Sequence, residues 1–314
     1  MQSSRTFFDP ALVEKSGSAF IREDKVDEAL ARLIPNVRIT KGRFSCPGFA
    51  EQRDLVWNHM DQNHRPLIHR TYGEAMRMFV GERSAFSLTR FGGWPAVIPV
   101  FDGHYKDNGF YQILCLFGLI VVVVIIETNK DADGTRMDVD WAIASHKFLR
   151  FVHPILDRRL QRLNDVQNRE DEQIRHRRVE LRTKGYRFVT DEPDFLNSNA
   201  MANNVVFPPL ASAFSVPIVA WSDGEVRQVD VGDRGYLVRR TGDAIEVWPA
   251  ICPHEGAALK TTDLHGRVAR CPWHGLEFGP RVLRPEGGPL TMCGAELTLV
   301  DGKLLVSPAT VRPT

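Results

Sequence analysis

The feature that most constrains this chain is a pair of short Cys/His motifs near its C-terminal end. The stretch CPHEGAALKTTDLHGRVARCPWHG covers residues 252–275 and contains Cys252-x-His254 and Cys271-x-x-His274. Spacings this short let one tight turn present two ligands, and two such turns that face each other can hold a metal centre. Thiolate ligands favour zinc or an iron–sulfur cluster, and imidazole suits both.

The residues around the four ligands help to separate these options. Gly256 and Gly275 follow the two ligand pairs, at positions where backbone amides must approach a ligand closely. Pro253 and Pro272 stiffen the two turns. A structural Cys2His2 zinc site does not require these glycines and prolines, and it stays as the alternative interpretation.

With these residues in place, the segment from about residue 216 to 308 resembles the Rieske family. The resemblance implies a [2Fe–2S] cluster. In such a cluster Cys252 and Cys271 would hold one iron, and His254 and His274 would hold the other.

Length and composition are those of a globular protein of about two domains. The 314 residues include 40 Lys and Arg and 39 Asp and Glu, so the net charge gives no footprint for binding nucleic acid or an anionic membrane. Five cysteines are too few and too scattered for a disulfide framework and fit a reducing compartment. The N-terminal residues lack a signal-peptide pattern, so we expect a cytoplasmic protein.

A strongly apolar run, ILCLFGLIVVVVII at residues 113–126, requires a separate interpretation. It is 14 residues long, whereas a membrane-spanning helix needs about 18 to 20. Its valines and isoleucines favour strands. We predict one or two buried strands and no transmembrane segment, with a membrane span as the alternative.

Hydrophobic periodicity predicts the remaining elements. Helices are expected at residues 25–34, 51–65 and 154–184, the last between Pro154 and Gly185. Strands are expected between about residues 67 and 145, including a hairpin at 118–145, and again as short strands after a loop at 191–214, beginning with VPIVAWS. We place the domain boundary in that loop, which gives domains 1–205 and 206–314.

A second metal motif lies in the first domain, in WNHMDQNHRPLIHR at residues 57–70. It reads Asn58-x-x-Asp61-x-x-His64-x-x-x-x-His69 and resembles the Rieske non-haem iron oxygenases of the ketosteroid-hydroxylase and demethylase type. The resemblance implies that His64 and His69 ligate a mononuclear Fe(II). It places Asn58 and Asp61 among the catalytic residues, with Asp61 bonded to a ligand histidine and bridging towards the cluster.

The third iron ligand is expected on the long helix. At roughly 100° per residue, Glu170 and Asp171 both fall near its apolar stripe. Asp171 matches the family's segment, and Glu170 is the alternative. His59 and His64 form a competing pair, which lacks the accompanying aspartate. Pro66 lies between the preferred ligands and predicts a break in the helix after His64.

The resemblance also implies an architecture and an activity. The fold class is α+β, with an N-terminal helix-grip domain of the START/SRPBCC-like type, in which a curved antiparallel sheet grips a long helix, and a small all-β Rieske domain. The domain order is the reverse of the family's usual order. The activity implied is that of a terminal oxygenase, which hydroxylates, demethylates or desaturates a small apolar substrate with O2.

Partners and rival functions complete the expectations. The family takes electrons from an external reductase or ferredoxin, and its members usually form rings, which implies a homo-oligomer such as a trimer. One rival function is an electron-transfer or redox-sensing Rieske protein fused to a non-catalytic ligand-binding domain. Another is a lipid-binding module with a structural cluster.

Overall fold

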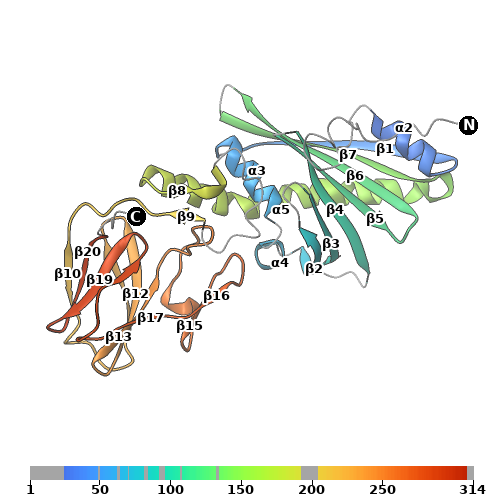
Figure 1. Ribbon diagram of the computed structural model, residues 1–314. Coiled ribbons are helices and arrows are strands. Elements are labelled where there is room, and N and C mark those ends of the chain that lie inside the picture. Colours follow the sequence, from blue (N-terminus) through green and yellow to red (C-terminus); the bar gives the residue numbers. More distant parts are fainter. Residues whose placement is uncertain are drawn as a thin grey trace, which may run out of the picture. The chain divides into compact units, whose positions relative to one another are not determined.

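The computed structural model divides the chain into two compact units (Figure 1). The N-terminal unit contains the described residues up to His176, and the C-terminal unit contains those from Arg177 onward. The structure describes residues 25–48, 50–61, 64–69, 71–80, 84–91, 96–106, 108–131, 134–191 and 204–309. The domain boundary predicted between residues 205 and 206 stays a prediction, and the long helix contributes residues to both units.

One large antiparallel sheet dominates the N-terminal unit, with the strands in the spatial order β1-β7-β6-β5-β4-β3-β2. The first strand of the chain therefore pairs with the last, and the intervening strands follow as a meander. The strands are β1 Val37–Pro47, β2 Tyr72–Val80, β3 Ser84–Phe91, β4 Val97–Lys106, β5 Gly109–Leu116, β6 Ile120–Asp131 and β7 Gly134–His146.

Two helices, α5 and α2, cover the sheet, and two others, α3 and α4, connect β1 to β2. The long helix α5 crosses one face, where Leu156 and Leu160 pack against the core (Figure 1). The short helix α2 packs on the opposite face through Val26 and Leu30. The helical elements of this unit are α2 Val26–Leu33, α3 Gln52–Met60, α4 Arg65–Ile68, the 3-10 helix η2 Lys147–Val152 and α5 His153–Thr183.

The apolar run at residues 113–126 belongs to β5 and β6, which confirms the prediction of buried strands. Val122, Val124 and Ile126 face the core under α5, while Val123 faces the core under α2. Because both faces of β6 are covered, the strand has apolar residues at successive positions instead of alternating ones. Among the described residues, no helix combines the length and apolar character that crossing a membrane requires.

The C-terminal unit consists of small antiparallel sheets ordered β10-β20-β19-β18, β11-β12-β13-β17, β14-β15-β16 and β8-β9. One core, which includes Tyr236, Val247 and Leu297, lies between the first two sheets. The elements are β8 Arg187–Phe188, η3 Val189–Asp191, β9 Val205–Val206, β10 Phe214–Pro217, β11 Val226–Val231, β12 Arg234–Thr241, β13 Ala244–Pro249, η5 Thr261–Asp263, β14 Leu264–His265, β15 Val268–Arg270, β16 Glu277–Phe278, β17 Arg281–Leu283, β18 Leu290–Met292, β19 Ala295–Val300 and β20 Lys303–Pro308.

This architecture confirms the predicted fold class, an α+β chain with a helix-grip domain followed by a small all-β domain. Two local predictions were wrong. The helix expected at 51–65 ends at Met60, and Pro66 lies in the first turn of α4, where its missing N–H has no helical partner to lose. The strand expected from Val216 to Ser222 ends at Pro217, because the chain turns there.

A close contact joins β1 to β7 and to α5. Gly42 pairs with Trp141 across the two strands, and the Trp141 indole N–H donates a hydrogen bond of 2.8 Å to Asp157 Oδ1 on α5. A Cβ atom on Gly42 would lie 2.3 Å from Trp141 Cε2 and 2.5 Å from Asp157 Oδ1. Only glycine leaves room for the indole at this position.

We therefore expect Gly42→Ala to displace Trp141 and to destabilise the protein by about 1–3 kcal/mol. Gly279→Ala is the matched control, because a Cβ there meets no atom within 4 Å, and we expect a change within about 0.5 kcal/mol. Denaturant unfolding followed by tryptophan fluorescence measures both variants. Equal effects of the two substitutions would contradict the packing role of Gly42.

Candidate metal centres

Two loops with the same backbone pattern carry the Cys/His motifs of the C-terminal unit. In the first, the Gly256 N–H donates to the Cys252 carbonyl at 2.9 Å, and the Cys252 N–H donates to the Ala257 carbonyl at 2.8 Å. In the second, Gly275 and Leu276 repeat the pattern around Cys271, with both bonds at 2.8 Å. Each loop is thus closed by two hydrogen bonds to its own cysteine residue.

Glycine is required where these loops turn. Gly256 and Gly275 have φ values of +84° and +64°, in the left-handed region that other residues rarely adopt. At Gly256 there is also no space, because a Cβ atom would lie 2.6 Å from Leu181 Cδ1. The expectation that these glycines allow a close backbone approach is consistent with both observations.

The four side chains of the motifs converge. His254 Nδ1 lies 3.3 Å from His274 Nδ1, and His274 Nδ1 lies 3.8 Å from Cys271 Sγ. Donor atoms bound to one ion at about 2.1 Å lie about 3.0 to 3.4 Å apart for right-angled to tetrahedral geometry, so the two imidazoles fit one iron. Cys252 and Cys271 are buried and form no disulfide. The donor set therefore fits a cluster with two sulfur and two nitrogen ligands.

A hydrogen bond joins the two thiols of the motifs. A hydrogen bond from Cys252 lowers the pKa of Cys271 to about 5, and the same bond raises the pKa of Cys252. Backbone N–H groups of His254 and Glu255 point at the Cys252 sulfur. The thiolate is the form that binds metal, and the contact favours this form at Cys271.

A second cluster lies in the N-terminal unit, where α4 and α5 bring His64, His69 and Asp171 together. All three side chains are buried, and their nearest donor atoms lie within 4.8 Å of one another. Nε2 of His64 and Nε2 of His69 each lie 3.3 Å from Asp171 Oδ1. This separation again matches that of donor atoms around one ion.

Further carboxylates hold the outer side of each ring. His64 Nδ1 lies 3.3 Å from Asp61 Oδ2, and His69 Nδ1 lies 3.1 Å from Glu170 Oε2. Metal-bound histidines usually donate their second ring N–H to a carboxylate, which leaves the other nitrogen free to bind the ion. The contact at His69 is a hydrogen bond of this kind, and at His64 the carboxylate lies at ion-pair distance. The sequence left open whether Asp171 or Glu170 is the third ligand. The two carboxylates differ in position, because Asp171 faces Nε2 of both histidines, while Glu170 faces Nδ1 of His69.

Arg175 orients the aspartate and connects it to Asn58. Its Nη2 lies 3.3 Å from Asp171 Oδ2, and its Nε donates to Asn58 Oδ1 at 2.9 Å. Among the described residues, no hydrogen bond reaches the buried Asp171 Oδ1. One oxygen of the carboxylate is thus occupied by the guanidinium, and the other is directed at the two imidazoles.

The charges of this cluster suit a cation. Burial would raise the pKa of Asp171, but the two imidazoles and the guanidinium hold it well below its usual range. Burial lowers the pKa of His69. At His64 burial acts in the same direction, but the carboxylates of Asp171 and Asp61 outweigh it and the pKa is raised. An ionised carboxylate beside a neutral imidazole is a ready donor set for a metal ion.

The competing pair of histidines, His59 and His64, is arranged differently from His64 and His69. His59 Nε2 lies 3.0 Å from the sulfur of Met137, and burial lowers the pKa of His59 to about 3. His59 lines a small cavity of about 40 Å³ beside the cluster, together with Gln112 and Asn164. That cavity has room for water or another small molecule only.

A larger cavity of about 460 Å³ lies between the sheet and α5. Its lining is mostly apolar and includes Ile98, Leu114, Leu116, Val122 and Leu160. Its size is within the range of pockets that enclose small organic ligands. The helix that lines it also carries Asp171, so one element borders both the apolar cavity and the histidine cluster.

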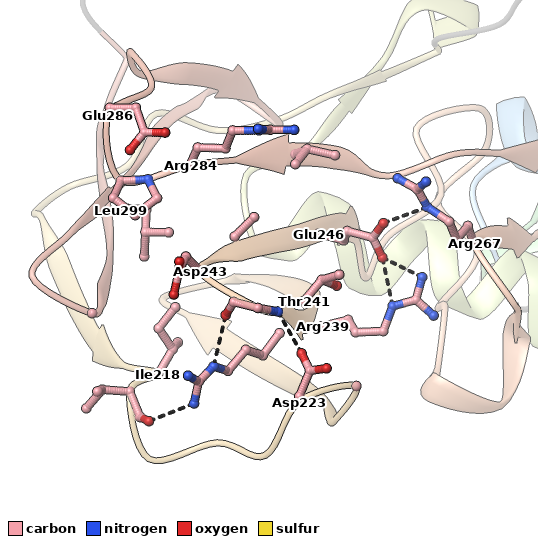
Figure 2. A pocket seen from close by; sticks show the side chains of 18 residues that line it. Ile218, Asp223, Arg239, Thr241, Asp243, Glu246, Arg267, Arg284, Glu286 and Leu299 are labelled. Atoms are coloured by element: carbon pink, nitrogen blue, oxygen red, sulfur yellow. Dashed lines mark hydrogen bonds and ion pairs between the residues drawn. The ribbon is translucent and has the colours of Figure 1, made fainter.

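A hollow of about 1010 Å³ lies around the β12–β13 turn of the C-terminal unit (Figure 2). None of the Cys/His motif residues lines it. Its buried Glu246 accepts from Arg239 at 2.7 Å and pairs with Arg267 at 2.6 Å. Arg240 donates to backbone carbonyls, including that of Val219. These charges are satisfied within the unit, and we assign the hollow no role.

A buried ion pair fastens the first Cys/His loop to the end of α5. Arg178 Nη1 donates to Glu255 Oε2 at 3.0 Å, and both side chains are fully buried. Asn204 donates to the same oxygen at 2.7 Å, and Arg178 also contacts Asp191 at 3.2 Å. The guanidinium lies 3.8 Å from the centre of the Phe188 ring. Glu255 follows His254 directly, so this network sets the path of a ligand-bearing loop.

Comparison with known proteins agrees with the geometry of the Cys/His motifs in the C-terminal unit. Residues 216–292 match the model of the Rieske [2Fe-2S] domain. The chain carries a Rieske domain. A search of curated proteins found no match.

Solved structures resemble the N-terminal fold at low sequence identity. Ara h 8.0201 is 7% identical with a TM-score of 0.35, over 42% of this chain and 96% of its own. The di-domain ARO/CYC StfQ from the steffimycin biosynthetic pathway is 9% identical with a TM-score of 0.40, over 50% of this chain and only 56% of its own. Mll3558 from Rhizobium loti is 12% identical with a TM-score of 0.35, over 43% of this chain and 98% of its own.

Sequence reasoning missed three residues of these sites: Arg175, Arg178 and Glu255. The two arginines follow Asp171 at intervals of four and three residues, on the buried stripe that includes Ile174 and Leu181. A cation on the apolar face of a helix indicates a buried anion nearby. That signal was present in the sequence, but two of the partners, Asn58 for Arg175 and Glu255 for Arg178, lie far away along the chain.

The buried pair predicts a large stability effect. Arg178→Ala would remove the fully buried guanidinium that pairs with the fully buried Glu255, and we expect a loss of about 3–5 kcal/mol. Arg169→Ala is the matched control on the same helix, because its pair with Asp165 is exposed, and its effect should stay within about 1 kcal/mol. Denaturant unfolding of the full chain measures both. A loss at Arg178 no greater than at Arg169 would contradict the role of the network.

Proposed function

We propose that this protein is a terminal oxygenase of the Rieske non-haem iron type. In this proposal a [2Fe–2S] cluster lies at Cys252, His254, Cys271 and His274, and a mononuclear Fe(II) lies among three residues of the other unit. The observation that carries the proposal is the convergence of His64, His69 and Asp171. Two histidines and one carboxylate with open positions are typical of non-haem iron sites that react with O2.

The chemistry divides between the bound groups and the protein. When bound, the cluster supplies single electrons and the mononuclear iron supplies the activation of O2. The protein holds the donor atoms in place. Asp61 and Glu170 fix the two histidine rings through Nδ1, so that each Nε2 faces the ion. Asn58 acts one step further out, because it positions Arg175.

Burial and charge support this division. Arg175 occupies one oxygen of Asp171, which favours binding of the ion through the other oxygen alone. Such single-oxygen binding leaves more positions on the ion for O2 and substrate. The side chains around the site exclude bulk water, which protects a reactive centre from side reactions.

The apolar cavity supports a small apolar substrate. Its volume of about 460 Å³ and its leucine, isoleucine and valine lining favour a hydrocarbon-like molecule over a charged metabolite. Hydroxylation, demethylation and desaturation all fit such a substrate. The proposal also requires an external reductase or ferredoxin as the electron donor, and includes a homo-oligomer in which subunits cooperate.

The rival function is a Rieske electron-transfer or redox-sensing protein with a ligand-binding helix-grip domain. The apolar cavity suits that function equally well. A ligand-binding domain does not need two buried histidines around one ionised aspartate, each with its own outer carboxylate. The cost of burying these polar groups is explained by a bound cation, which favours the oxygenase.

Iron analysis tests the proposal directly. Protein purified without oxygen should contain about three irons and two acid-labile sulfides per chain. His69→Ala and Asp171→Asn should each lower the iron content to about two, with sulfide and the electron paramagnetic resonance of the reduced cluster unchanged. Cys252→Ser should remove the sulfide and leave about one iron.

Two further variants sharpen the assignment. His59→Ala is the matched control for His69→Ala and should keep the third iron, because His59 faces Met137. Glu170→Gln should keep the iron but weaken its binding by about 10–100-fold, as expected for an outer partner. Two irons in the parent protein, with no loss on His69→Ala, would favour the electron-transfer function instead.

A further inference from the structure

The segment that leads into α5 has apolar side chains on two faces. Leu149, Val152 and Leu156 pack against the core of the N-terminal unit. Phe148, Phe151 and Ile155 lie on the other face, with 77%, 69% and 54% of their surface exposed. A helical segment at the surface of a soluble domain normally has polar residues on its outer face. This face therefore requires an explanation beyond folding.

A second element adds exposed apolar residues at the same end of the sheet. The turn between β5 and β6 exposes 67% of Phe117 and 61% of Leu119. Because Ile120 pairs with Ser145 near the end of β7, this turn lies beside the start of η2. We call the five residues the apolar tip: Phe117, Leu119, Phe148, Phe151 and Ile155.

Basic residues accompany the apolar tip. The net charge of the whole chain is +1, but residues 147–162 contain five basic residues and a single acidic one. The acidic residue, Asp157, accepts a hydrogen bond from Trp141. The basic residues are Lys147, Arg150, Arg158, Arg159 and Arg162, and all five are exposed. Overall neutrality thus conceals a local excess of positive charge.

The apolar cavity begins on the same segment. Leu156, Arg159, Leu160 and Arg162 line it, about one to three helical turns after Phe151. The segment that exposes the two phenylalanines therefore continues directly into the lining of the cavity.

We propose that the apolar tip docks on the surface of an anionic lipid bilayer. Exposed aromatic and aliphatic side chains with lysine and arginine close by in the same segment match the two properties of such a surface, an apolar interior below negatively charged headgroups. A surface of this kind inserts its side chains and needs no complementary groove. The docking surface is independent of the proposed oxygenase activity, because it involves none of the metal ligands.

Flotation with lipid vesicles tests the proposal on the full chain. The protein should bind vesicles made of equal parts phosphatidylcholine and phosphatidylglycerol, and bind phosphatidylcholine vesicles much less. Phe148→Ser with Phe151→Ser should reduce binding by about tenfold or more, since two inserted rings are lost. Lys147→Glu with Arg150→Glu should act similarly, and added salt should weaken binding of the parent protein.

Met78→Ser provides the matched control. Met78 has 56% of its surface exposed on β2, at the opposite edge of the sheet from β1, and its replacement should leave vesicle binding unchanged. Exposed positions tolerate serine, so thermal unfolding should be the same for all variants. Iron content, measured in parallel, reports on the proposed function separately, because docking requires no metal.

Three results would overturn the proposal. The first is a parent protein that anionic vesicles do not retain, and the second is a double phenylalanine variant that binds them as well as the parent. The third is a dimer of the parent protein, detected by light scattering, that the phenylalanine variant abolishes. In that case the apolar tip is an interface between copies of this chain.

Discussion

A buried charge in a protein has to be paired, and Asp171 is the buried charge on which the N-terminal site depends. The guanidinium of Arg175 binds one carboxylate oxygen, and two imidazoles face the other from 3.3 Å. The carboxylates raise the pKa of His64, whereas burial lowers that of His69, so the two rings differ in how readily they take up a proton. In the proposed function a bound cation takes the place of that proton beside Asp171.

The helix α5 positions these contacts through its periodicity. Asp171, Arg175 and Arg178 follow at intervals of four and three residues, which places them along one face. The first two belong to the histidine cluster, and the third holds the loop that carries His254. Apolar residues on the same face, such as Ile174, fix the rotation of the helix. The same rotation of α5 about its axis thus places both the apolar core residues and the polar site residues. A change in that rotation would disturb both sets.

The sequence predicted the architecture well because its signals are local. The apolar run at residues 113–126, the hairpin after it and the bounds of α5 depend on periodicity and on turn residues within a few positions. The convergence of His64 and His69 on Asp171 depended on a family resemblance, since the ligands are separated by about a hundred residues. No local pattern could show that Glu255 contacts Arg178, or that the helix expected at residues 51–65 ends at Met60.

The Cys/His loops have a consequence for how the protein matures. Each loop is closed by hydrogen bonds of its own backbone, from Gly256 and to Ala257 in one case and from Gly275 and to Leu276 in the other. These bonds fix the path of the backbone from each cysteine to the histidine that follows it. An error in one turn during folding would therefore misplace two ligands of the cluster at once.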